Sequence, residues 1–282
     1  MMDMFLELAP TGILQGLVLG IIALGILIPF RLMNLPDLTG EGAYSLGAIF
    51  SCVLLIFGFP PLVSILFGCV AGGLLGVATA ILYLRFKVGT LLGGIILSTM
   101  VYSINLRLMG KPNMAIFEYK SLFSKNLVLD IAIVALCLIS TAAVLLLFLK
   151  TEKGLRFRTI GLNSLFGERQ SINLNSYTML GFFISNALCA FSGSLMVQIQ
   201  GYGDINMGIG IVIHALAALM IGEVILGTQS LQRQLAAPIL GALIYQQIQG
   251  FALTLGLAPS DLKFLTGSMI LSVIVFSGKK NA

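Results

Sequence analysis

Residues 11–30 read TGILQGLVLGIIALGILIPF and contain no charged side chain. A helix needs about 20 apolar residues to cross the hydrocarbon core of a bilayer, so this stretch is long enough to span a membrane. Eight more apolar stretches follow, and we expect helices at 11–30, 42–58, 61–84, 88–107, 128–149, 176–200, 207–227, 235–256 and 262–277. The sequence therefore predicts an all-α, polytopic helical membrane bundle of about 8–9 transmembrane helices.

The composition of the whole chain agrees with this prediction. Of the 282 residues, 58% are apolar and 10% are charged, and the mean hydropathy is +1.04. A soluble domain carries about 25% charged residues, so soluble, secreted disulfide-built and disordered classes are excluded. The loops leave no room for a soluble catalytic domain, and we expect one transmembrane domain over residues 1–282. The four cysteines occur singly in apolar runs, which predicts neither disulfides nor a metal site.

The charged residues predict the orientation. Alternating the loops between the two sides of the membrane places eleven of the sixteen basic residues on one side: Arg31, Arg85, Lys87, Lys150, Lys153, Arg156, Arg158, Arg169, Arg233, Lys279 and Lys280. Cytoplasmic loops carry an excess of Lys and Arg, so this side is expected to be cytoplasmic, with the N-terminus outside and the C-terminus inside. The net charge of +5 then reflects topology and gives no sign of nucleic-acid binding. Asp3 and Glu7 are the wrong charge for a cleavable signal peptide, so we expect the first span to be retained.

Small residues recur at helical spacing, which is typical of close helix packing in membranes. The clearest ridges are Gly12/Gly16/Gly20, Gly68/Gly72/Gly76 and Gly89/Gly93. No convincing internal repeat is visible. A short echo between 94–98 (GIILS) and 269–272 (MILS) falls on spans that do not correspond in order.

The segment 34–42, NLPDLTGEG, brings polar groups to the membrane boundary between the first two spans. Its proline and glycines discourage a continuous helix. One interpretation is a broken helix beside a pathway, because non-helical backbone is tolerated at membrane depth where it lines a wet cavity. The other is an ordinary cytoplasmic turn in which Asp37 or Thr39 caps the next helix. The sequence leaves both open.

Several polar residues fall inside the predicted spans. An ionisable or amide group in hydrocarbon is costly and usually faces a cavity or a partner. Glu223 is the most informative, although it lies near the cytoplasmic end of its span, where it can simply reach water. His214 alone is more often a satisfied core histidine than a proton relay. The full set is Ser98, Asn105, Asn186, Gln198, His214, Glu223, Gln246 and Gln247.

The loop 150–175 is the longest and most basic of the predicted cytoplasmic segments. It begins KTEKGLRFRTIGLNSLFGERQSIN, with Leu162, Leu165 and Phe166 at the spacing of one apolar stripe on a short amphipathic helix. A soluble partner could bind such a helix on the membrane face. The alternative is an interfacial helix in a positive loop without a partner. Length and periodicity favour the partner modestly.

Several stretches together carry a resemblance to a known family. They are 37–48 (DLTGEGAYSLGA), 158–163 (RTIGLN), 180–185 (LGFFIS) with 190–193 (AFSG), 214–222 (HALAALMIG) and 240–244 (LGALI). In this order and spacing they resemble the permease subunits of ABC importers for branched-chain amino acids and ribose-type sugars, and within these a branch associated with aromatic amino acids. The similarity covers about residues 12–275. Ser171-Ile172 stands where the family has Gly-Ile, and Leu165-Phe166 where it has small alanines.

The resemblance implies a type II ABC importer permease fold that forms a pore in the bacterial cytoplasmic (inner) membrane. It also implies no cofactor of its own, a cytoplasmic ATP-binding subunit that binds the 150–175 loop, an extracytoplasmic solute-binding protein and a second permease copy. No nucleotide-binding G-x-x-x-x-G-K-[ST] run occurs in the chain. The residues expected to couple the chain to the ATPase are Arg156, Arg158, Gly161, Asn163 and Gly167. Those expected in the translocation pathway are Asn34, Asp37, Thr39, Glu41 and Ser98.

Two other classes of function remain. An intramembrane serine protease would use Ser192 with His214, but a lone pair of residue types is weak evidence for a catalytic geometry, and the glycines such proteases need are missing. A secondary transporter or channel acting alone also uses broken helices at midplane sites. It needs no basic coupling loop. The substrate is expected to be a small polar solute, with an amino acid favoured on the resemblance alone.

Overall fold

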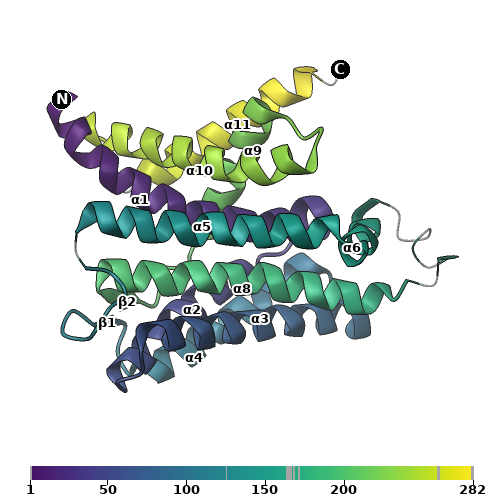
Figure 1. The fold of residues 1–282 in the computed structure, drawn as a ribbon, viewed down its shortest axis with the longest axis horizontal. Helices are drawn as coiled ribbons and strands as arrows, with labels where there is room; N and C mark the ends of the chain where they lie inside the picture. Colours follow the sequence, from purple (N-terminus) through teal and green to yellow (C-terminus); the bar gives the residue numbers. More distant parts are fainter. Residues whose placement is uncertain are drawn as a thin grey trace.

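The structure is a computed structural model that describes residues 2–124, 126–162, 167, 169–170, 172–258 and 261–280. Its elements are α1 (Met2–Leu27), the π-helix η1 (Ile28–Leu32), α2 (Thr39–Ile56), α3 (Pro61–Phe86), α4 (Thr90–Met109), β1 (Asn113–Ala115), α5 (Leu127–Lys150), α6 (Glu152–Leu162), α8 (Leu174–Gln200), β2 (Tyr202–Asp204), α9 (Ile211–Leu226), α10 (Leu231–Thr254) and α11 (Leu262–Lys280) (Figure 1). Each of the nine predicted spans contains a helix, and the all-α fold class is confirmed. Among the described helices, six are long and apolar enough to cross a membrane, and two shorter apolar helices accompany them.

The bundle has two ends, which we call the α6 end and the β end. The antiparallel strands β1 and β2 pair Met114 with Gly203 at one end, and α6 lies at the other (Figure 1). The chain begins at the β end and α11 finishes at the α6 end (Figure 1). Arg31, Arg85 and Lys150 all lie in last turns of helices at the α6 end. The predicted basic side of the bundle therefore corresponds to one end of the structure.

Two of the three predicted glycine ridges form close helix contacts. Gly68, Gly72 and Gly76 of α3 face α8, where added β-carbons would lie 2.2–2.5 Å from atoms of that helix. Gly12 and Gly16 of α1 face α10, with corresponding distances of 3.1 and 3.2 Å. The α3–α8 contacts need the bare backbone of glycine, which lets two helices approach closely in lipid, whereas the α1–α10 contacts are only tight.

The prediction of close helix packing at the third ridge, Gly89/Gly93, is wrong. Nothing lies within 4 Å of a β-carbon added at Gly89, and at Gly93 the nearest atom is 3.7 Å away. The close contact on α4 belongs to Gly94, where an added β-carbon would lie 2.7 Å from the amide nitrogen of Thr39. Gly89 precedes the first residue of α4, so it lies outside the helical face that meets α2.

The fold contains an inverted repeat that the sequence does not reveal. In each half a long helix (α1 or α8) is followed by a non-helical break (33–38 or 205–210) and then by a helix that starts inside the bundle (α2 or α9). The third helix of each half packs on the long helix of the other half: α3 on α8, and α10 on α1. Because α1 runs toward the α6 end and α8 away from it (Figure 1), the two halves have opposite directions.

The sequence echo between residues 94–98 and 269–272 falls on α4 and α11, the fourth helices of the two halves. The prediction that these spans do not correspond is therefore wrong. The two spans occupy equivalent positions in an inverted repeat, not in a tandem one. In the chain, α5 lies between the two halves. Large apolar side chains on α5, such as Leu136 and Ile139, are exposed and form a face suited to lipid.

Candidate functional site

Residues 33–38, between η1 and α2, form a break in the helical bundle. The break runs alongside α8 from the α6 end, and Asp37 accepts a hydrogen bond there from the side chain of Asn186 at 3.0 Å. Asn186 lies twelve residues after the first residue of α8, which corresponds to about 18 Å along the helix at 1.5 Å per residue. The first residues of α2 are therefore deep inside the bundle and not in a surface turn.

Asp37 and Thr39 act mainly as structural groups in this break. One carboxylate oxygen of Asp37 accepts from the backbone amide of Thr39 at 2.8 Å and from its hydroxyl at 2.5 Å. The Thr39 hydroxyl also lies 2.7 Å from that of Thr79 on α3. Asp37 thus caps the first backbone amide of α2, as expected for a capped turn. The cap lies deep inside the bundle, as expected for a broken helix. Both side chains are buried.

Asn34 lies at the opposite end of the break from Asp37 and is exposed near the α6 end. Its φ of 54° is in the left-handed region, which asparagine tolerates better than most residues. A reversal of the chain at this point redirects the backbone from the end of η1 back into the bundle.

Glu41 joins the second helices of the two halves, α2 and α9. Its carboxylate accepts a hydrogen bond at 3.1 Å from the backbone amide of Gly210, immediately before α9 begins. A β-carbon at Gly208 would lie 2.4 Å from the carbonyl oxygen of Glu41, so the break 205–210 packs directly on the first turn of α2. The N-termini of α2 and α9 therefore meet inside the bundle, and each presents the positive end of a helix dipole.

A hollow of about 270 Å³ opens beside this meeting point. Its polar lining comes from α2 and α4, and Ile205, Gly208 and Ile209 of the second break complete it. Two of the five predicted pathway residues, Glu41 and Ser98, line the hollow, whereas Asn34, Asp37 and Thr39 do not. The polar lining residues are Glu41, Ser45, Ser98, Thr99 and Tyr102.

The remaining amides in the spans have partners within the bundle. Asn105 donates to the hydroxyl of Ser45 at 3.2 Å, and Gln198 accepts from the backbone amide of Leu122 at 3.0 Å. Gln247 donates to the carbonyl of Ala9 at 3.1 Å. These contacts offset part of the cost of polar groups among apolar helices, and the buried Oδ1 atoms of Asn105 and Asn186 have no hydrogen-bond partner among the described residues.

The helix predicted in the 150–175 loop is α6, and it packs through a different face from the one expected. Gly154, Phe157 and Gly161 contact the bundle, and the Phe157 ring lies edge-on to that of Phe148 with centroids 6.1 Å apart. Leu162 is 79% exposed, so it is not part of a buried stripe. Leu165, Phe166 and Ser171 lie outside the described residues. The sequence signal that was missed is the small–aromatic–small spacing of the three packed residues.

The predicted coupling residues lie on two different faces of this region. Arg156 is exposed and forms an i,i+4 ion pair with Glu152 at 3.9 Å, and Arg158 is half-buried. Gly161 faces inward, where an added β-carbon would lie 2.2 Å from the carbonyl oxygen of Leu32 in η1. Gly167 is buried, and its carbonyl accepts two backbone amides in the turn before α8. Asn163 lies outside the described residues.

Glu223, near the end of α9, forms an ion pair with Arg31 of η1. The guanidinium Nε donates to one carboxylate oxygen at 2.8 Å, and a terminal nitrogen contacts the other oxygen. η1 is therefore held both by α6, through Gly161, and by α9. The candidate coupling helix α6 therefore contacts η1, and η1 leads directly into the break 33–38.

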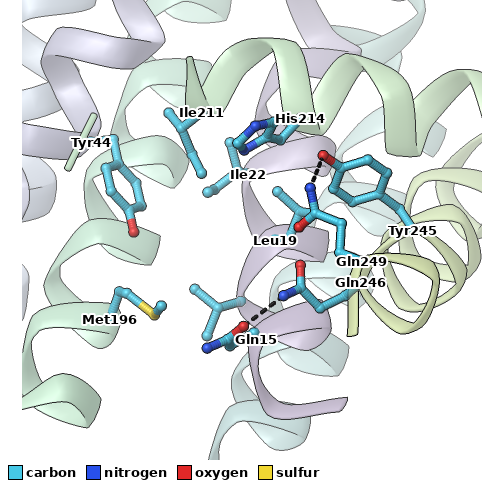
Figure 2. Close-up of a pocket in the computed structure, with 11 residues that line it drawn as sticks. Gln15, Leu19, Ile22, Tyr44, Met196, Ile211, His214, Tyr245, Gln246 and Gln249 are labelled. Carbon is cyan, nitrogen blue, oxygen red and sulfur yellow. Dashed lines mark hydrogen bonds between the residues drawn. The ribbon is translucent and has the colours of Figure 1, made fainter. Parts of the chain in front are cut away.

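A second pocket, of about 170 Å³, was not foreseen from the sequence (Figure 2). His214 lines it and packs against the ring of Tyr245, with centroids 5.9 Å apart. The Ser192 hydroxyl instead donates to the carbonyl of Val18 at 2.9 Å, which is a helix-packing contact and not an activated nucleophile. Among the residues that the structure describes, no three His, Cys, Asp or Glu side chains cluster as metal ligands would.

Comparison with known proteins agrees with this architecture. Residues 9–275 match the family described as the permease component of the branched-chain amino acid transport system. The chain is 39% identical over 263 residues to a tyrosine transport system permease protein of Clostridioides difficile (strain R20291), covering 92% of this chain and 88% of that protein. It is 31% identical over 266 residues to an uncharacterized protein of Rickettsia prowazekii (strain Madrid E), covering 92% and 94%.

The fold is also similar to a solved structure. That structure is described as a metal-chelate type ABC transporter in an inward-facing conformation, with a TM-score of 0.54, 18% identity, and coverage of 94% of this chain and 85% of that chain. At this identity the likeness concerns the fold alone. The type II ABC permease-like fold expected from the resemblance is confirmed.

Proposed function

Because the chain belongs to the permease component family of the branched-chain amino acid transport system, we propose that it forms the membrane pathway of an ABC importer for an amino acid. We propose an aromatic amino acid as the substrate, since the relative that shares 39% of its residues is a tyrosine transport system permease. A separate cytoplasmic ATPase would supply the energy. An external binding protein would deliver the substrate.

The observation that carries this proposal is the hollow at the meeting of the two breaks. Glu41 and Ser98 line it beside the N-termini of α2 and α9, deep in the bundle. Transporters commonly build solute sites from discontinuous helices, because free backbone groups and helix dipoles can contact a charged solute there. The amino acid's carboxylate would be attracted to the helix N-termini, and its ammonium group to Glu41.

The hollow also supports a pair of permease copies around one pathway. Thr99, Tyr102 and Ser103 are exposed on the same stretch of α4. Polar side chains at this depth are costly in contact with lipid, so a second copy would cover them and share the aqueous path. The pathway would then run from the β end, along Ser98 and Glu41, to the exposed Asn34 at the α6 end.

We place the ATPase at α6, on the cytoplasmic side of the inner membrane, which puts the N-terminus outside and the C-terminus inside. Leu155, Arg156 and Leu162 project from the face of α6 that points away from the bundle. The opposite face reaches η1 through Gly161. When nucleotide closes the ATPase, α6 would move η1 and the break 33–38 with it, and the bundle would exchange between two arrangements.

Reconstitution into proteoliposomes tests the proposal. The permease would be combined with the ATPase and binding-protein subunits of the same organism, and uptake of labelled tyrosine would be measured with ATP on the ATPase side. Uptake is expected only with all components and ATP, and a non-hydrolysable analogue should prevent it. Uptake by the permease alone, driven by an ion or solute gradient, would instead support a secondary transporter or channel.

A further inference from the structure

The second pocket lies between α1, α2, α8, α9 and α10, apart from the hollow at Glu41 (Figure 2). In Figure 2, Tyr44 and Met196 stand on one side of the space, and Gln246, Gln249 and Tyr245 stand on the other. No residue of this pocket has a role in the pathway proposed above. The question is what a space of this size and lining could hold.

The volume of about 170 Å³ matches a single six-membered ring. A cavity of about 150 Å³ in a protein core binds benzene. Much of the wall here is apolar, with Val18, Leu19, Ile22 and Ile211 as aliphatic contacts. Met196 adds a thioether, which makes favourable contacts with aromatic rings.

Some polar side chains of the pocket form hydrogen bonds to one another and others do not. Gln246 donates to Gln15 at 2.6 Å, and Gln249 donates to the Tyr245 hydroxyl. The His214 ring packs on Tyr245 and forms no side-chain hydrogen bond among the described residues, and neither does the hydroxyl of Tyr44, whose side chain is only 3% exposed. Figure 2 shows this hydroxyl directed into the pocket. This hydroxyl is free to form a hydrogen bond with a polar group of a ligand in the pocket.

The pocket adjoins the proposed pathway. Tyr44 is the chain neighbour of Ser45, which lines the hollow, and Ile211 lies two residues after Ile209, which also lines it. Glu41, which lines the hollow, also accepts a hydrogen bond from Gly210, the residue directly before Ile211. The two spaces are therefore lined by neighbouring residues at the starts of the same two helices, α2 and α9.

We propose that this pocket binds a phenol-type aromatic ring, and we assign that ring to the side chain of the transported amino acid. The assignment to transport rests on the function proposed above, whereas binding of the ring does not. The apolar walls would hold the ring faces, and Tyr44 would form a hydrogen bond with the polar substituent.

The test uses the full chain in lipid nanodiscs and ¹⁹F NMR titration with two probes, 4-fluorophenol and 4-fluorotoluene. In Ile211→Trp an indole would fill the pocket, and Ile139→Trp provides the same change on α5, where Ile139 is 66% exposed. Tyr44→Phe removes only the hydroxyl. Tyrosine uptake would be measured for each variant in the reconstituted transporter.

Wild type and Ile139→Trp are expected to bind both probes, and Ile211→Trp neither. Tyr44→Phe should weaken 4-fluorophenol binding by about 2- to 12-fold, the value of one hydrogen bond, and leave 4-fluorotoluene unchanged. Absence of binding to wild type, or binding that Ile211→Trp leaves intact, overturns the ring site. If binding behaves as expected but wild type shows no amino acid uptake, the ring site stands and the proposed function falls. If Ile211→Trp loses binding but takes up tyrosine normally, the assignment to transport is overturned.

Discussion

Arg31 of η1 and Glu223 of α9 form an ion pair that joins the two halves of the inverted repeat at the α6 end. The Arg31 side chain is 52% exposed and that of Glu223 is 11% exposed, so water and salt weaken the attraction only in part. The pair holds together the segment that α6 contacts and α9, the helix whose first residues lie beside Glu41. It is therefore placed to affect how the two halves move relative to each other.

Glu223→Gln should destabilise the chain by about 0.2–1 kcal/mol, the range measured for exposed pairs, and Glu223→Arg by more, because it places two cations together. The double variant Arg31→Glu/Glu223→Arg should recover most of that stability. Thermal unfolding in detergent, compared at low and high salt, checks this. If the double variant loses as much thermal stability as Glu223→Arg alone, the two side chains do not interact.

Asn186→Leu should destabilise the fold strongly. The substitution removes the amide that donates to Asp37 and leaves one buried carboxylate oxygen without its partner, at a cost of about 1–3 kcal/mol. The double variant Asp37→Leu/Asn186→Leu removes both polar groups. Its loss of stability should be smaller than the sum of the losses in the two single variants. Strictly additive losses in thermal unfolding would contradict the pairing.

Gly76→Ala and Gly89→Ala form a matched pair. At Gly76 the new β-carbon would lie 2.2 Å from the carbonyl oxygen of Phe182 on α8, so the helices must separate, at a cost of about 1–3 kcal/mol. At Gly89 the space is open, and alanine should be tolerated. The melting temperature should fall for the first variant only. Equal behaviour of the two would show that α3 and α8 are not packed backbone to backbone.

Gly161→Leu should uncouple ATP hydrolysis from transport while the chain stays folded. The new side chain would collide with the carbonyl of Leu32 and displace α6 from η1, but both elements lie at the surface end of the bundle. Gly250→Leu on α10 is the control, since nothing lies within 4 Å of a β-carbon there. The measurement is ATPase activity of the reconstituted complex with and without substrate-loaded binding protein. Full stimulation with Gly161→Leu would contradict the coupling role.

Ser98→Cys should react with water-soluble thiol reagents, because the hollow at Ser98 is expected to contain water. The background is a variant in which the four native cysteines are replaced by alanine. Thiols react as thiolates, which form in water and not in lipid, so Ile96→Cys on the exposed apolar side of α4 should react at least about tenfold more slowly. Modification of Ser98→Cys should also block uptake. Equal rates at both positions would contradict a wet pathway beside Ser98.

Much of the fold could be predicted because the bilayer imposes a length and a polarity on every spanning helix. All nine apolar stretches became helices, and the Gly68/Gly72/Gly76 ridge became a close contact, since a run of small residues has few other uses in lipid. The basic residues also gathered at one end. The Gly89/Gly93 ridge failed because spacing alone does not show which residues of a helix face a neighbour.

The candidate site was predicted only in part. The structure brings Glu41 and Ser98 to one hollow, whereas Asp37 and Thr39 are buried beside it and hydrogen-bonded to each other, so their place in the pathway stays a prediction. The pocket at Tyr44 was missed, because its lining comes from five helices and no local pattern links Gln15 to Gln249. The inverted repeat was missed for a related reason: α3 and α10 occupy equivalent places through their packing, which different sequences can satisfy.

The sequence by itself determined that this chain is a helical membrane protein, where its helices lie along the chain and which family it resembles. These properties depend on local apolar length and on short motifs, both of which are written in consecutive residues. Only the tertiary structure decided that the segment around Asp37 is a break deep inside the bundle. That depth depends on where the start of α2 lies along α8. Contacts between residues about 150 positions apart, such as Asp37 and Asn186, set this position.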